Sequence, residues 1–285
     1  MKTVNVRGLR FAYLEEGAGP LVLLLHGFPD NAESWSHQVP ALVKEGYRVV
    51  APYLRGYRPT DLGEGGFYDK ATLVADVAGL IDAFNDGKPC HVVGQDWGAI
   101  ITYGLLAAHP ELVQRAVVMA VPHPEQVTKS LIDPRHVQRS YHWWYFHMPD
   151  LPEKAMSVND MAFIDYLWDI WTVNEYDDPA HMRSVKQTFA QPGVITATLA
   201  YYRAMLDPSK ADPALADLRA LMARRISVPT LALCGADDMR AELMQDQAQY
   251  FDGEYDFRLI EHSGHFLHRE QPELVNREVI EWLSR

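Results

Sequence analysis

Continuous apolar runs recur along the chain and, in its first half, alternate with segments of helical periodicity. Residues 21–25 are Leu-Val-Leu-Leu-Leu, a run typical of a strand that is buried on both faces. Further buried strands are expected at residues 48–51, 90–94, 115–121 and 229–234, and another apolar strand at 255–260. Helices are expected at 34–45, 72–86, 99–109 and 272–284. Strands that alternate with helices are joined by right-handed crossovers and form a mostly parallel sheet. A ligand is then expected at the carboxyl ends of the strands.

The alternation stops between residues 134 and 212. There, many aromatic side chains follow a helical spacing and no buried strand is evident. Pro134 and the Asp212-Pro213 step bound the segment, since a residue before proline tends to leave the helical conformation. We interpret residues 134–212 as a helical cap, or lid, inserted into a core formed by residues 1–133 and 213–285.

Composition narrows the range of partners. The 285 residues are 48% apolar and 22% charged, as in ordinary globular proteins. A net charge of −12 argues against nucleic acid and anionic membranes as partners, because phosphates attract clusters of lysine and arginine. Residues 1–16 alternate apolar and polar side chains, which predicts a strand pair rather than a signal peptide, so a cytoplasmic enzyme is expected. The oligomeric state stays open, with a homodimer among the options.

The histidines and cysteines do not predict a metal site. None of the twelve histidines falls in a His-Glu-x-x-His arrangement, and no Cys-x-x-Cys pair occurs. Cys90 and Cys234 lie beside apolar runs, where buried thiols usually fill space. We therefore expect neither a metal nor a cofactor.

A turn between two glycines follows the apolar run at 90–94. Gly94-Gln95-Asp96-Trp97-Gly98 reads as a nucleophile elbow, which pushes its middle side chain out at the head of the sheet. An aspartate, with an ordinary pKa of about 3.9, is ionised at neutral pH and needs no base for its own attack. Attack on an ester would give a high-energy anhydride, whereas attack on a saturated carbon with a good leaving group gives an alkyl ester. The motif therefore favours epoxides or alkyl halides as substrates; the alternative is that Asp96 only caps a helix.

A second loop at the same edge of the sheet is a candidate oxyanion hole. His26-Gly27-Phe28-Pro29 follows the strand expected at 21–25. The backbone N–H groups of Phe28 and Trp97 are the donors that we expect to hold a developing negative charge. The alternative interpretation of the tetrapeptide is an ordinary turn between a strand and a helix.

Candidates for a catalytic base and its partner lie near the C-terminus. His265 follows the strand expected at 255–260 and can activate water against an ester formed at Asp96. His262 and His268 are its rivals. After the strand at 229–234 come two aspartates, of which we expect Asp238 to orient the imidazole and Asp237 to serve the turn.

These motifs, in this order, resemble the α/β-hydrolase family and, within it, the epoxide hydrolases and their dehalogenase relatives. The resemblance spans nearly the whole chain and implies a mostly parallel eight-stranded sheet flanked by helices, with an inserted helical cap. In that family the acid stands three positions after the glycine of its loop, which favours Asp238. Cap residues of the family hold the epoxide oxygen. The segment 200–204 resembles the one that carries such a tyrosine, at Tyr202, and alignment back from Pro149 puts His142 where many members have a second tyrosine.

The leaving group distinguishes the two activities. An opened epoxide is an alkoxide that must receive a proton, whereas a departing halide needs only N–H or O–H dipoles. Tyr202 and His142 suit both reactions, and the indoles of Trp97 and Trp143 suit a halide. Trp143, His26 and Tyr145 are the further candidates for substrate contact.

Two departures from the relatives favour an epoxide. Haloacetate dehalogenases that resemble this chain carry arginines just after the nucleophile, where it has Trp97 and Ile100. Many haloalkane dehalogenases have an asparagine at the position of Phe28. A third departure does not distinguish the two activities. Arg58 stands where relatives usually have glycine, and it is either a solvated residue or a contact to an anionic substrate group.

The hypothesis is therefore a cofactor-free epoxide hydrolase that takes a small apolar substrate and water. The alternative is a dehalogenase with the same nucleophile. A non-catalytic ligand-binding protein of the same fold is a more remote one. A purely structural interpretation of the cap residues, as aromatic packing within the lid, also remains open for Trp143, Tyr145 and Tyr202.

Overall fold

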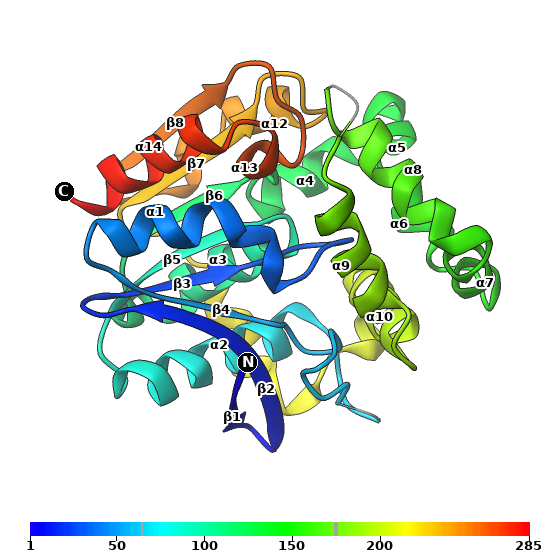
Figure 1. Cartoon of the computed structure of the whole chain (residues 1–285), viewed down its shortest axis with the longest axis horizontal. Coiled ribbons are helices and arrows are strands. Elements are labelled where there is room, and N and C mark those ends of the chain that lie inside the picture. Colours follow the sequence, from blue (N-terminus) through cyan, green and yellow to red (C-terminus); the bar gives the residue numbers. More distant parts are fainter. Residues whose placement is uncertain (64, 174–175) are drawn as a thin grey trace.

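The computed structural model describes residues 1–63, 65–173 and 176–285, and its centre is one eight-stranded sheet (Figure 1). The strands are β1 (Lys2–Val6), β2 (Leu9–Gly17), β3 (Leu21–Leu25), β4 (Arg48–Pro52), β5 (Cys90–Gln95), β6 (Val113–Met119), β7 (Thr230–Gly235) and β8 (Tyr255–Ile260). Their order is β1-β2-β4-β3-β5-β6-β7-β8. Only β2 runs antiparallel to its neighbours, so six consecutive strands are parallel.

The central strands are buried because helices cover both faces of the sheet. Every residue of β3, β5 and β7 is buried, in keeping with their apolar sequences. The helices α1 (Gln38–Lys44) and α14 (Pro272–Leu283) pack together, and α2 (Lys70–Asn85) packs with α3 (Trp97–Ala108). This arrangement confirms the predicted fold class.

One predicted helix divides in two. Residues 34–45 were expected to form a single helix, but the structure has a 3₁₀ helix at Ala32–His37 followed by α1. Pro40 lacks an N–H and is tolerated only in the first turn of an α-helix. The α-helix therefore begins only two residues before Pro40.

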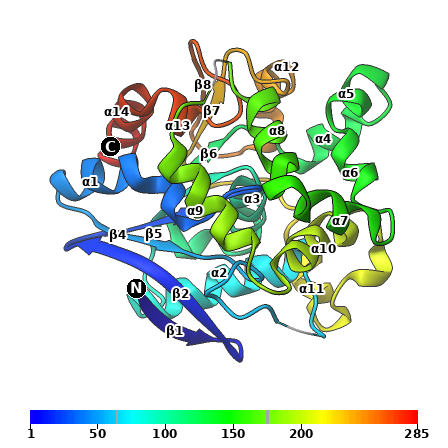
Figure 2. The same ribbon diagram turned by 45° about the vertical axis from the view of Figure 1, so that its right-hand side comes forward.

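Helices alone occupy the described residues between β6 and β7. They are α4 (Pro124–Ser130), α5 (Pro134–Arg139), α6 (Tyr141–Tyr145), α7 (Leu151–Ser157), α8 (Ala162–Trp171), α9 (Pro179–Phe189), α10 (Val194–Leu206) and α11 (Ala216–Leu221), with short 3₁₀ turns. Figures 1 and 2 show α5–α10 gathered on one side of the sheet. The predicted division at 134 and 212 leaves α4 and α11 with the core, and both pack on core helices, α4 on α12 (Ala241–Gln245) and α11 on α2 and α3.

Helices α8 and α10, in the segment predicted to be a cap, bond to the core beside the loop at 26–29. The indole N–H of Trp168 in α8 donates to the Pro29 carbonyl over 3.0 Å, and the Trp168 ring stacks on Phe266 with 3.6 Å between centroids. On α10, the Tyr201 hydroxyl donates to the Arg55 carbonyl over 2.6 Å. These bonds fix the cap over the carboxyl ends of the parallel strands. No helix in the described residues is both long and apolar enough to cross a bilayer.

The turn after β5 brings backbone against backbone. Asp96 has φ 51° and ψ −116°, a conformation that a non-glycine residue adopts rarely. A Cβ atom on Gly98 would overlap the Leu25 carbonyl of β3, and one on Gly94 would overlap the Gly98 carbonyl. The strain at Asp96 is therefore held by two glycines whose neighbours leave no room for a side chain.

The Gly98→Ala variant should lose folding free energy because a β-strand carbonyl cannot move away from the new methyl group. We expect about 1–3 kcal/mol or more from overpacking, measured by urea denaturation. Gly104→Ala, in the same helix, meets side-chain atoms of Met222 and Val74 and should cost less. Equal stability of Gly98→Ala and the wild type would contradict the close approach of α3 to β3.

Candidate active site

The elbow presents the Asp96 carboxylate at the head of the sheet, with 7% of the residue exposed. Its Oδ1 atom accepts a hydrogen bond of 2.8 Å from the Phe28 N–H, on the loop after β3. Its Oδ2 atom lies 3.4 Å from Nε2 of His265. Trp97 is the first residue of α3, so its N–H has no partner within the helix and lies at the positive end of the helix dipole. The arrangement suits a negative charge on the carboxylate.

His265 lies between two aspartates. Its Nδ1 atom is 3.0 Å from Oδ2 of Asp238, on the loop after β7. The other oxygen of Asp238 accepts the backbone N–H of Arg240 over 2.7 Å, which fixes the carboxylate. The neighbouring Asp237 is exposed, as expected for a turn residue.

The two rival histidines lie away from Asp96. His262 is exposed, and its backbone has φ 55°. His268 is buried, and its Nε2 atom is 2.7 Å from the hydroxyl of Ser34, in the 3₁₀ helix at Ala32–His37. Of the three candidates, only His265 is within ion-pair distance of Asp96 in the described structure.

Asp96, His265 and Asp238 form a charged row in which the imidazole lies between two carboxylates. Burial alone would lower the pKa of His265, but Asp238 and Asp96 raise it to about 9, so the imidazole is protonated at neutral pH. Burial would raise the pKa of Asp96, but the hydrogen bond and charge of His265 and the Phe28 N–H lower it below its usual value. The resting site is therefore a carboxylate, an imidazolium and a second carboxylate.

Tyr202 of α10 faces this row from the cap and is 2% exposed. Its ring centroid lies 5.2 Å from that of Trp97 and 5.2 Å from that of Phe28. Burial and the charge of Asp96 hold the pKa of Tyr202 well above its usual value, so the hydroxyl keeps its proton. The side chain can therefore donate a hydrogen bond near Asp96.

His142 of α6 lies beside Tyr202, with 5.7 Å between ring centroids. Burial, with the charges of Arg240 and His265, holds its pKa well below the usual value, so the ring is neutral. Its Nδ1 atom is buried and has no hydrogen-bond partner among the described residues. His142 is thus an N–H dipole and not the imidazolium that proton donation to an alkoxide would favour.

The three candidate substrate contacts lie in different surroundings. Both ring nitrogens of His26 are engaged: Nδ1 lies 3.0 Å from the Gly27 carbonyl, and Nε2 accepts the Leu54 N–H over 3.1 Å. His26 therefore shapes the loop and offers no free polar atom to a ligand. Trp143 is buried with its ring stacked on Trp144. Tyr145 is half-buried and stacks on Phe163 within the cap, with 5.7 Å between centroids.

Sequence reasoning missed two residues and left one open. The Trp171 carbonyl of the cap accepts the His265 N–H over 2.7 Å, and the Trp171 ring lies 5.3 Å from the imidazole. Gln95, the variable residue of the elbow, donates to the His265 carbonyl over 3.1 Å. Arg58 donates from Nε to the Pro192 carbonyl over 3.1 Å and so joins a core loop to the cap. Only the position of Gln95 inside the elbow offered a signal in the sequence.

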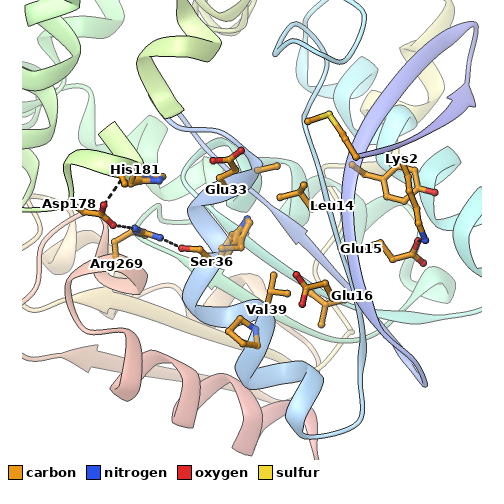
Figure 3. A pocket seen from close by; sticks show the side chains of 17 residues that line it. Lys2, Leu14, Glu15, Glu16, Glu33, Ser36, Val39, Asp178, His181 and Arg269 are labelled. Atoms are coloured by element: carbon orange, nitrogen blue, oxygen red, sulfur yellow. Dashed lines mark hydrogen bonds and ion pairs between the residues drawn. The ribbon is translucent and has the colours of Figure 1, made fainter. Parts of the chain in front are cut away.

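One pocket of the structure reaches this site, and a larger one lies apart from it. A pocket of about 330 Å³ is lined by Asp238 and His265 together with cap residues such as Trp171. Another, of about 670 Å³, lies between β2 and the 3₁₀ helix at Ala32–His37 (Figure 3). Arg269 and Asp178 pair at one end of it, and none of Asp96, His265 and Asp238 lines it. The larger pocket is therefore separate from the charged row.

The described part of the chain contains no cluster of three or more histidine, cysteine, aspartate or glutamate side chains suited to a metal ion.

Comparison with known proteins shows what the whole chain resembles. A model of the alpha/beta hydrolase family matches residues 22–278. The AB hydrolase superfamily protein YfhM of Bacillus subtilis is 32% identical, over 99% of this chain and 96% of its own length. Epoxide hydrolase 4 of Mus musculus is 30% identical, over 94% of this chain and 75% of its own length. The crystal structure of epoxide hydrolase A from Mycobacterium thermoresistibile superposes with a TM-score of 0.78 and 28% identity, covering 99% and 97% of the two chains.

The protonation of His265 is open to direct measurement. Because its pKa is raised from 6.5 to about 9, its charged form adds folding free energy that is fully present below about pH 6.5 and is lost as pH rises through 9. A histidine ¹³C NMR titration should show one resonance, absent from His265→Gln, with a midpoint near 9. Asp96→Asn should lower that midpoint by removing a neighbouring negative charge. A wild-type midpoint at or below 6.5 would contradict the ion-paired resting state.

Proposed function

The chain belongs to the alpha/beta hydrolase family, and from that premise we propose that it is an epoxide hydrolase, which opens an epoxide to a vicinal diol. One observation carries the proposal. The elbow holds an aspartate, Asp96, whose two oxygens meet the Phe28 N–H and the His265 imidazole beneath the buried phenol of Tyr202. The relatives named epoxide hydrolases, at about 30% identity, support it.

In the proposed first step Asp96 attacks an epoxide carbon. The carboxylate oxygen forms a new bond to carbon as the bond between that carbon and the epoxide oxygen breaks. Tyr202 donates its proton to the leaving oxygen, and the resulting phenolate is reprotonated from water. His142, neutral and 5.7 Å from Tyr202 between ring centroids, contributes an N–H dipole to the same oxygen. The product of the step is an alkyl ester on Asp96.

The second step uses the charge that the first step removes. Esterification neutralises Asp96, one of the two carboxylates that raise the pKa of His265, so that pKa falls and the imidazolium releases a proton to solvent. The neutral imidazole then takes a proton from water as the oxygen attacks the Asp96 carbonyl carbon. The Phe28 and Trp97 N–H groups hold the oxyanion. When the ester bond breaks, the imidazolium returns that proton to the departing oxygen and the diol leaves. The new Asp96 carboxyl then gives its proton to the imidazole, so Asp96 is again a carboxylate and His265 an imidazolium.

A dehalogenase with the same nucleophile is the second candidate. Trp97 and Trp171 carry buried indole N–H donors, and Nε1 of Trp171 has no hydrogen-bond partner among the described residues. Such donors suit a departing halide, which needs no proton. The buried phenol of Tyr202 favours the epoxide reaction, because only that leaving group must be protonated. A ligand-binding protein without activity would need none of the row formed by Asp96, His265 and Asp238.

A panel of aryl and alkyl epoxides, bromoacetate and a bromoalkane tests the function. We expect diol from at least one epoxide without bromide from either halide. The Asp96→Asn variant should lose roughly 10⁴-fold or more in turnover, because the nucleophile is gone. Asp237→Asn, the exposed neighbour of the triad acid, is the matched control and should stay close to the wild type. Release of bromide would favour the dehalogenase, and inactivity on every compound the binding protein.

A further inference from the structure

The loop that carries His265 is in backbone contact with the end of α8. The His265 N–H donates to the Trp171 carbonyl over 2.7 Å. A Cβ atom on Gly264, the residue before, would overlap that same carbonyl, so a larger residue there would push the two segments apart. Trp171 belongs to the segment predicted to be a cap, whereas His265 belongs to the core. The position of the histidine backbone therefore depends on a segment outside the core.

Glu270 joins the same two segments through its side chain. It is the last residue of α13 (Leu267–Glu270). Its Oε2 atom accepts the Gly264 N–H over 3.0 Å, and its Oε1 atom accepts the Val173 N–H over 2.9 Å. One carboxylate thus binds a backbone group on each side of the contact. None of the mechanistic steps uses this side chain.

The carboxylate of Glu270 has no cation as its partner in the described part of the chain. The residue is half-buried, and the adjacent Arg269 pairs instead with Asp178 at 2.6 Å. Burial, with the charge of Asp238, raises the pKa of Glu270, and the two N–H bonds and the charge of His265 oppose that rise. An ionised carboxylate accepts such N–H bonds more strongly than a neutral oxygen does. The two backbone N–H groups are therefore its principal partners.

The two steps of the proposed cycle need His265 differently. Ester formation uses the Asp96 carboxylate and the Tyr202 proton, whereas ester hydrolysis needs the imidazole within reach of the attacking water. Nε2 of His265 lies 3.4 Å from Oδ2 of Asp96 in the resting site. Misplacement of a catalytic group by about 1 Å lowers a rate by about 10²-fold. A shift of the loop would therefore slow the second step and spare the first.

We propose that Glu270 is a positioning residue: its carboxylate ties the catalytic histidine to the segment 171–173, and this tie sets the rate at which water attacks the ester. The inference rests on the proposed function for the ester and on the two backbone contacts for the tie. In the described structure the side chain of Glu270 bonds to those two N–H groups and not to Asp96 or to the imidazole. It therefore acts through the loop and takes no part in proton transfer.

Rapid-mixing kinetics of Glu270→Gln test the step that the tie controls. The glutamine oxygen can accept one of the two N–H groups, but its amide nitrogen is a donor and opposes the other. Hydrolysis of the ester should slow by roughly 10- to 100-fold, so that the ester accumulates, while ester formation stays within about twofold of the wild type. Glu261→Gln removes an exposed carboxylate from the same loop and should leave both steps unchanged. Equal falls in both steps of Glu270→Gln, or unchanged hydrolysis, would overturn the inference.

The Glu270→Asp variant separates position from charge and needs no substrate. Aspartate keeps the negative charge, but it is one methylene shorter and loses at least one of the two bonds. The His265 ¹³C resonance, expected to titrate near 9 in the wild type, should then titrate closer to 6.5, because the imidazole moves away from its two carboxylates. An unchanged midpoint would overturn the positioning role even in an enzyme that opens epoxides. A lowered midpoint in a protein that opens no epoxide would refute the proposed function and support the tie.

An NMR titration of the wild-type protein keeps the inference testable if either variant fails to fold. A protonated carboxyl group is a weaker acceptor than a carboxylate, so an amide proton bonded to it shifts as the group titrates. The amide protons of Val173 and Gly264 should shift with one common midpoint, above the 4.5 that is ordinary for glutamate, because both bind Glu270. Two different midpoints, or no shift at either amide, would overturn the inference.

Discussion

The site depends on one buried cation held between two carboxylates. Asp238 and Asp96 lie 3.0 Å and 3.4 Å from the two nitrogens of His265, and each charge compensates the burial of its neighbour. Removal of one of the two negative charges therefore lowers the pKa of the His265 imidazole. This coupling gives the proposed cycle its order, because formation of an ester on Asp96 is the event that converts His265 into a base.

The rest of the fold holds Asp96, His265 and Asp238 in position. The elbow glycines bring α3 against β3 and force Asp96 into a strained conformation. The cap then covers the row: the Trp171 carbonyl holds the His265 N–H, and Trp168 bonds to the loop that supplies the Phe28 N–H. Core and cap thus each position part of the charged row.

The sequence predicted the elements whose signal is local. The strands at 21–25 and 255–260 have the predicted bounds, although only the first is a buried apolar run and, of the second, only Ile260 is buried. Other features depend on distant contacts. Whether His142 is charged depends on burial by the cap, and the second bond of His26 comes from Leu54, in another loop.

A single turnover in ¹⁸O-labelled water tests the covalent cycle most directly. With enzyme in excess over an epoxide substrate, water attacks the carbonyl carbon of the ester. One label should then appear in the peptide that contains Asp96, and the diol should leave with an unlabelled oxygen from the enzyme. Mass spectrometry of that peptide and of the product distinguishes the outcomes. Label found only in the diol, with the Asp96 peptide unchanged, would show that water attacks the substrate directly and would contradict this account.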